Sequence, residues 1–280
     1  MAITINTNVD SLTAQKNLNS SMSKLTNNFQ SLSSGKRINS AADDAAGLAI
    51  SANLTAEVKS LQQATRNSYD AVSVTQIADG GMENMSDNIG RMRELAMQAA
   101  NGSYSDSDRA LMQQEYSQIK QEVDRVASST EYNGQKLLDG SSPSMDFQVG
   151  SGVGDQVSVN LPKISTAELG KTATSTTSVA DTSISTAAGA QAALATLDKA
   201  SQQISRQRAS LGAAQNVFSS TINNLENKTI NVSAANSRIQ DADIAQEVSK
   251  LTQNQIMTQA GAQVLGQANM TGLIALKLLN

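Results

Sequence analysis

Residues 197–239 read LDKASQQISRQRASLGAAQNVFSSTINNLENKTINVSAANSRI and carry an apolar side chain at every seventh position. Such a repeat is typical of a long helix that packs against other helices along one stripe. At about 1.5 Å per residue, the helix is roughly 60 Å long, which favours a rod over a globule. The stripe ends at Ile239, and we expect its other members to form a rod core: Leu197, Ile204, Leu211, Phe218, Leu225 and Val232.

Two earlier stretches, 82–99 and 112–126, have apolar residues at the three- and four-residue spacing of a helix buried along one face. The first belongs to a helix expected from about residue 42 to 100. The second belongs to a helix that is expected to begin at Asp106 or Ser107 and to fade at 133–134, where the sequence is Asn-Gly. The three helices predict a mainly α fold, an elongated antiparallel helical bundle.

Ser40 and Asp43 form an S-x-x-D pattern that predicts the capped start of the helix from about 42. The adjacent carboxylates of Asp43 and Asp44 could also suggest a metal or acid–base site. Neighbouring helical residues point about 100° apart, however, so they do not converge on one ion. Capping is the better interpretation.

One β element interrupts the predicted helices. Apolar and polar residues alternate on both sides of a glycine-rich turn at 150–155, which predicts a β-hairpin over about 145–161. A G-x-G-x-G run can approach a phosphate, but no helix follows directly and no P-loop lysine is present. The Ser/Thr/Ala tract over about 171–190 is expected to be a short exposed loop.

The composition excludes several classes of function. The 280 residues contain no histidine and no cysteine, which excludes a Ser-His-Asp or Cys-His pair, the usual zinc sites and disulfides. Aromatic residues are 2% and the net charge is −4, so nucleic acid is not an expected partner. The chain shows no secretory signal pattern and no run of eighteen apolar residues, so no membrane insertion is expected. We predict no enzyme, no cofactor and no metal.

The two ends of the chain differ from its middle. Residues 1–42 have four basic residues and one acidic residue, a net charge of +3; residues 237–280 have three of each, a net charge of 0, which leaves −7 for the middle. Both ends carry apolar stripes, and the segment LIALKLL at 273–279 is apolar on nearly every side. We expect other copies of the chain to bury these stripes, so that both ends are disordered in the free monomer and become helical on assembly. The assembly residues are Leu18, Met22, Leu25, Phe29, Leu32, Ile244, Val248, Leu251, Val264, Leu273, Ile274, Leu276, Leu278 and Leu279.

Several long strings resemble the bacterial flagellins. They include LSSGKRINSAADDAAGLAIS at 32–51, RMRELAMQAAN at 91–101, EYNGQKLLDG at 131–140 and NSRIQDADIAQEVSKLTQNQI at 236–256. The resemblance covers nearly the whole chain. Where many flagellins insert large variable domains, this sequence has only the tract near 171–190, so it resembles a minimal form.

The resemblance implies a structural subunit of the flagellar filament, the propeller for swimming. Residues 1–42 with 237–280 would form an inner coiled-coil domain, and residues 43–236 an outer helical rod. It further implies export without a cleaved signal peptide, an extracellular location, a chaperone on the C-terminal helix, and contacts with the filament cap and hook-associated proteins. Two alternatives are a hook–filament junction protein and a non-flagellar helical binding or signalling module.

The resemblance also implies recognition by the mammalian toll-like receptor for flagellin. Its recognition pattern matches Arg91, Leu95 and Glu115 here. The alternative is that these are ordinary rod residues, with Leu95 packed and both charges solvated. The sequence leaves both interpretations open.

Overall fold

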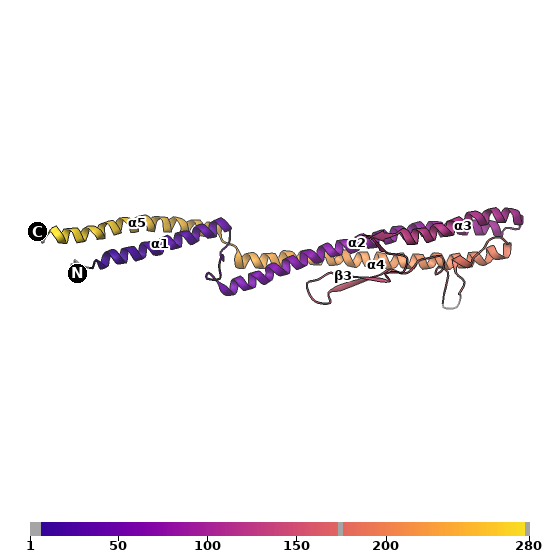
Figure 1. Ribbon diagram of the computed structural model, residues 1–280, viewed down its shortest axis with the longest axis horizontal. Coiled ribbons are helices and arrows are strands. Elements are labelled where there is room, and N and C mark those ends of the chain that lie inside the picture. Colours follow the sequence, from indigo (N-terminus) through magenta and orange to yellow (C-terminus); the bar gives the residue numbers. More distant parts are fainter. Residues whose placement is uncertain (1–6, 173–175, 278–280) are drawn as a thin grey trace. The chain divides into compact units, whose positions relative to one another are not determined.

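The computed structural model describes residues 7–172 and 176–277, with side chains described as far as residue 270. It confirms the mainly helical fold class (Figure 1). The helices are α1 Val9–Ser34, α2 Ala45–Ala100, α3 Asp106–Ser129, α4 Ala187–Gln240 and α5 Ile244–Lys277, and the strands are β1 Glu131–Tyr132, β2 Gln135–Lys136, β3 Ser144–Gln148 and β4 Gln156–Asn160.

The chain divides into two compact units. Unit 1 comprises residues 1–58 and 230–280, and unit 2 comprises residues 59–229. The division falls inside α2 and α4.

In unit 2, α2 and α4 run antiparallel and α3 folds back along α2 (Figure 1). Ion pairs between Asp79 and Arg208 and between Arg93 and Asp198 follow this antiparallel order. The core between the helices is built from methionine, alanine and branched aliphatic side chains. Five of the six predicted core residues are buried in unit 2: Leu197, Ile204, Leu211, Phe218 and Leu225. The sixth, Val232, belongs to unit 1 and is half-buried.

The predicted hairpin is the antiparallel pair of β3 and β4, in which Phe147 lies opposite Val157. The ring of Phe147 meets the ring of Phe218 edge to face, with centroids 5.7 Å apart, which attaches the hairpin to α4. A second hairpin, β1 with β2, was not predicted. Its turn is the Asn133-Gly134 pair, both with positive φ, so this dipeptide closes a hairpin after α3 has already ended at Ser129.

The start of α2 corrects the predicted cap. Asp43 accepts hydrogen bonds from the backbone and hydroxyl of Ser40, but the two residues form a turn of their own before the helix. The cap is Asp44, whose carboxylate accepts a hydrogen bond from the backbone of Gly47 at 2.8 Å. By contrast, α3 begins at Asp106, one of the two predicted residues, behind a capping box formed by Ser105 and Asp108.

Part of the tract predicted as an exposed loop is buried. Val179 and Ile184 are fully buried within the core cluster of unit 2. The buried Tyr116 hydroxyl lies 2.6 Å from the Thr182 hydroxyl, and the Lys120 ammonium donates to the Ala180 carbonyl at 2.7 Å. These bonds hold the segment against α3, because each satisfies a polar group that the segment covers.

In the described ranges, no helix is long and apolar enough to cross a membrane. The same part of the chain contains no group of acidic residues that could hold a metal ion.

Candidate functional site

In unit 1, α1 and α5 pack against each other in antiparallel orientation (Figure 1). The facing positions follow a regular alternation of three and four residues on both helices, as in a two-stranded coiled coil. We call these positions the seam. Its members are buried or half-buried: Ala14, Leu18, Ser21, Leu25, Asn28 and Leu32 from α1, and Glu247, Leu251, Asn254, Thr258, Gly261, Leu265 and Ala268 from α5.

The seam contains a buried polar cluster of Asn28, Glu247 and Asn254. The amide nitrogen of Asn28 donates to the Glu247 carboxylate at 3.1 Å, and the amide oxygen of Asn28 accepts from Asn254 at 3.2 Å. The second carboxylate oxygen of Glu247 accepts from Lys250 at 2.7 Å. Asn28 and Glu247 are 8% and 9% exposed, so the cluster is closed to solvent on most sides.

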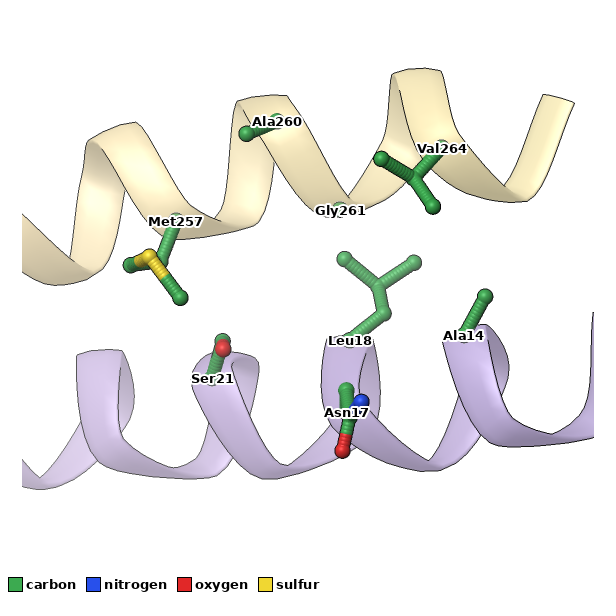
Figure 2. Close-up of a pocket in the computed structure, with 8 residues that line it drawn as sticks. All are labelled: Ala14, Asn17, Leu18, Ser21, Met257, Ala260, Gly261 and Val264. Atoms are coloured by element: carbon green, nitrogen blue, oxygen red, sulfur yellow. The ribbon is translucent and has the colours of Figure 1, made fainter. Parts of the chain in front are cut away.

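At the other end of the seam, Asn8 caps α1 and donates from its side chain to the Ala268 carbonyl at 2.8 Å. Between the polar ends lies a cavity of about 220 Å³, and Figure 2 shows Leu18 reaching across the seam toward Gly261. A side chain at Gly261 would meet Leu18 at 3.3 Å, so the missing side chain allows this close approach.

Outside the seam, α1 and α5 expose many large apolar side chains. Phe29 is 49% exposed and Val248 is 44% exposed. Ten large apolar residues are exposed on the described parts of the two helices, and we call them together the exposed apolar face: Val9, Leu12, Met22, Phe29, Ile244, Val248, Ile256, Met257, Val264 and Met270. So many exposed apolar side chains on two helices indicate a protein–protein contact site.

The connectors of unit 1 pair with each other where α1 ends and α5 begins. Lys36 and Asp241 form an antiparallel bridge, and the Arg37 guanidinium donates to the Ile239 carbonyl at 2.7 Å. Ile38 is buried beside Gly47, where an added side chain would lie 2.7 Å from Ile38.

The structure distributes the predicted assembly residues between two surfaces. Leu18, Leu25, Leu32 and Leu251 lie in the seam, whereas Met22, Phe29, Ile244, Val248 and Val264 lie on the exposed apolar face. Leu273, Ile274 and Leu276 have side chains outside the described residues, and Leu278 and Leu279 lie wholly outside them. The polar cluster was not among the predicted sites, although an asparagine within a leucine stripe is a recognisable signal.

The residues predicted for receptor recognition lie in unit 2. The Arg91 guanidinium donates twice to one carboxylate oxygen of Glu115, at 3.0 and 2.8 Å, and also to Glu94 at 2.9 Å. The hydrogen bonds that Arg91 donates to Glu115 and then to Glu94 raise the pKa of Arg91, which keeps its charge fixed. The Arg91 and Glu115 side chains are about half exposed, but Leu95 is 2% exposed and belongs to the core.

A helical bundle with a well-filled core, joined to a two-helix unit that exposes its apolar face, defines a structural protein that assembles with other chains. Family models agree with this class. The model of the bacterial flagellin N-terminal helical region matches residues 5–143, and that of the C-terminal helical region matches residues 194–279.

Individual relatives match over nearly the whole chain. A flagellar filament 30.7 kDa core protein of Treponema maltophilum is 39% identical and covers 99% of both chains. A flagellin of Bacillus subtilis is 38% identical, with coverage of 98% of this chain and 99% of that one. A solved flagellar hook-associated protein of Vibrio parahaemolyticus has a TM-score of 0.61 over 71% of this chain and 100% of its own, but at 16% identity it shows a common fold alone.

The chain belongs to the bacterial flagellins. It is a flagellar filament subunit, a structural protein and not an enzyme, as the sequence predicted. Its short length agrees with a minimal form of the family.

Proposed function

We propose that the subunit polymerises chiefly through an inner domain of residues 1–42 and 237–280, while residues 43–236 form the outer domain. The observation that carries this proposal is the exposed apolar face of α1 and α5. Each large apolar side chain that is removed from water contributes roughly 1.5–3 kcal/mol. Neighbouring copies are the partners that a filament supplies to every subunit.

The energetics of unit 1 support a role for assembly in ordering its helices. Among its described apolar residues, only Ala14 and Ile38 are buried within the subunit. Ordering each backbone residue costs about 1–2 kcal/mol, so a two-helix pair with so small a core gains much of its stability from other copies. We expect amide hydrogen exchange in α1 and α5 to be fast in monomer and slow in filament.

Polymerisation after seeding tests the apolar face. The variant Phe29→Ser with Val248→Ser removes two of its side chains, whereas the control Leu111→Ser changes a residue of unit 2 that is more exposed, at 67%. We expect the double variant to lose most of its filament yield and the control to keep it, as measured by sedimentation and electron microscopy. Equal yields would contradict the proposal.

We further propose that the filament lies outside the cell, that the chain is exported unfolded by the flagellar type III apparatus, and that cap and hook-associated proteins contact it at the filament ends. A cytoplasmic chaperone would cover α5, which carries six of the exposed apolar residues. Calorimetric titration with the export chaperone tests this last partner. Ile256→Ser with Met257→Ser should weaken binding, whereas Met22→Ser with Phe29→Ser on α1 should not.

Recognition by the host toll-like receptor is a second proposed role. The half-exposed Arg91–Glu115 pair supports it, since a rigid pair of opposite charges offers a defined polar contact. Leu95 would act by holding α2 in place, because its side chain is buried.

A receptor-reporter cell assay tests this role. Arg91→Ala with Glu115→Ala should weaken signalling while filaments still form. Arg125→Ala with Glu122→Ala removes a comparable exposed pair from α3 and should leave signalling unchanged. Unchanged signalling in the first variant would count against the proposal.

A further inference from the structure

The seam between α1 and α5 combines a stripe of five leucines with a buried polar cluster. It buries the side chains of Asn28 and Glu247, while Phe29 and Met257 remain about half exposed. The leucines favour pairing along this stripe, but apolar contact is non-directional and tolerates neighbouring rotations of the helices. A directional interaction is therefore needed to fix one arrangement.

The polar cluster supplies a directional interaction of this kind. Asn28 uses both ends of its amide, one toward Glu247 and one toward Asn254. The opposite amide orientation would place its oxygen against a carboxylate, so the chemistry admits only one arrangement. Glu247 is satisfied at both oxygens, by Asn28 and Lys250.

We propose that the cluster of Asn28, Glu247 and Asn254 selects the faces through which α1 and α5 pair, and thereby keeps the exposed apolar face free for neighbouring copies. The identity of those neighbours rests on the proposed function. The choice of pairing faces depends only on residues of unit 1.

A rotation of the helices shows why the cluster favours the observed pairing of α1 and α5 over other pairings. A turn of about 100° brings Phe29 to the place of Asn28, since adjacent helical residues differ by that angle. Glu247 then loses its donor from α1 while still facing a helix. A buried charge without its partner is strongly unfavourable, and a single buried asparagine is known to specify pairing in coiled coils at a cost in stability.

Disulfides between introduced cysteines can show which faces of α1 and α5 meet, because the chain has no cysteine of its own. The Leu18→Cys and Gly261→Cys pair reports the observed seam: a Cβ built at Gly261 lies 3.8 Å from the Leu18 Cβ, which suits a disulfide. The Met22→Cys and Met257→Cys pair reports a rotated arrangement, since each residue is next to a seam position in the sequence and they are 52% and 54% exposed. Non-reducing gels separate cross-links within a chain from those between chains.

The experiment compares three backgrounds of the full-length protein, before and after polymerisation. In the unaltered background, the seam pair should form the intrachain disulfide and the rotated pair should not. In Asn28→Leu with Asn254→Leu, the ratio of seam to rotated cross-linking should fall at least about tenfold, since a buried hydrogen-bonded contact to a charge is worth that much. The control, Ser21→Leu with Thr258→Leu, changes two other seam residues and should keep the ratio.

A further variant separates face selection from simple stability. Asn28→Ala with Glu247→Ala and Asn254→Ala leaves no buried charge and adds no large apolar side chain to the seam, so its helix content by circular dichroism should equal or exceed that of the unaltered protein. Its cross-linking ratio should nevertheless fall. An unchanged ratio in this variant, or no intrachain seam disulfide in the unaltered background, would overturn the inference.

The outcome is independent of the polymerisation test. A Phe29→Ser with Val248→Ser variant that keeps the seam cross-link and polymerises normally would contradict the proposed role of the apolar face only. A chain that polymerises normally with an unchanged ratio after loss of the cluster would contradict face selection only.

Discussion

Unit 1 and unit 2 are both helical, yet they bury their apolar residues in opposite ways. Unit 2 encloses a continuous core along α2, α3 and α4, with side chains such as Met85, Tyr116 and Phe218 fully buried. Unit 1 buries a polar cluster within its leucine seam and leaves many other large apolar side chains exposed. The difference shows that helical periodicity describes an apolar face without stating whether the same chain or another chain covers it.

Two phenylalanines provide the strongest contrast between the units. Phe218→Ala removes a fully buried ring that contacts Phe147, and should destabilise unit 2 by about 3–5 kcal/mol. Phe29→Ala removes a ring that is 49% exposed, and should change monomer stability by no more than ~0.5 kcal/mol while reducing filament yield. Urea unfolding and sedimentation measure the two effects. Comparable destabilisation by both changes would remove the distinction.

Arg109 tests how unit 2 tolerates a buried charge. Its side chain is 8% exposed and donates to the Ala99 and Asn101 carbonyls at the end of α2 and to Asp106. Arg109→Ala removes one donor from each of these carbonyls and should cost about 2–3 kcal/mol in urea unfolding. Arg109→Lys should recover only part of this, because an ammonium cannot reproduce the fork of a guanidinium. Full recovery would show that charge alone matters.

Two glycines of α2, one in each unit, should respond in opposite directions to replacement by alanine, with smaller changes in stability. In unit 1, a side chain at Gly47 would lie 2.4 Å from the Asp44 carboxylate and close to Ile38, so Gly47→Ala should cost about 1–3 kcal/mol. In unit 2, Gly90 has open space around it, and Gly90→Ala should stabilise the helix by about 0.5–1 kcal/mol. Thermal unfolding followed by circular dichroism measures both. The same sign of change at both sites would contradict this account.

The smallest expected effect is a pH dependence at the start of α3. Hydrogen bonds from the Ser105 hydroxyl and backbone lower the pKa of Asp108. A lowered pKa in the folded state adds stability above the ordinary pKa of about 3.9, and that stability is lost as the pH falls through the folded value. Nuclear magnetic resonance should show the first turn of α3 fraying in this acid range. Asp108→Asn should abolish the local transition.

The core of unit 2 could be predicted from sequence because its pattern has one interpretation. Apolar residues at every seventh position from Leu197 to Leu225 face the other helices of the same unit, and all are buried. Val232 continues the pattern but is only half-buried, because it lies beyond residue 229, where unit 2 ends. Spacing along one helix contains no information on where its partners end.

The interior of unit 1 could not be predicted in the same way. Leu25 and Phe29 belong to one apolar stripe in the sequence, but they lie in the seam and on the exposed face respectively. Their separation depends on Asn28, whose partners Glu247 and Asn254 are more than two hundred residues away in the chain. Likewise, Asp44 rather than Ser40 caps α2, because the Ser40–Asp43 pattern closes a turn that local sequence does not distinguish from a helix start.

The enclosed Tyr116 gives this protein an internal optical indicator of folding. The chain has no tryptophan and four tyrosines, so its near-ultraviolet absorbance comes largely from phenol rings. Burial raises the pKa of Tyr116 despite its hydrogen bond with Thr182. While the surrounding helices are intact, this phenol keeps its proton under alkaline conditions that ionise an unfolded tyrosine. A delayed phenolate absorbance therefore measures, without any label, the fraction of subunits whose outer helices are properly closed.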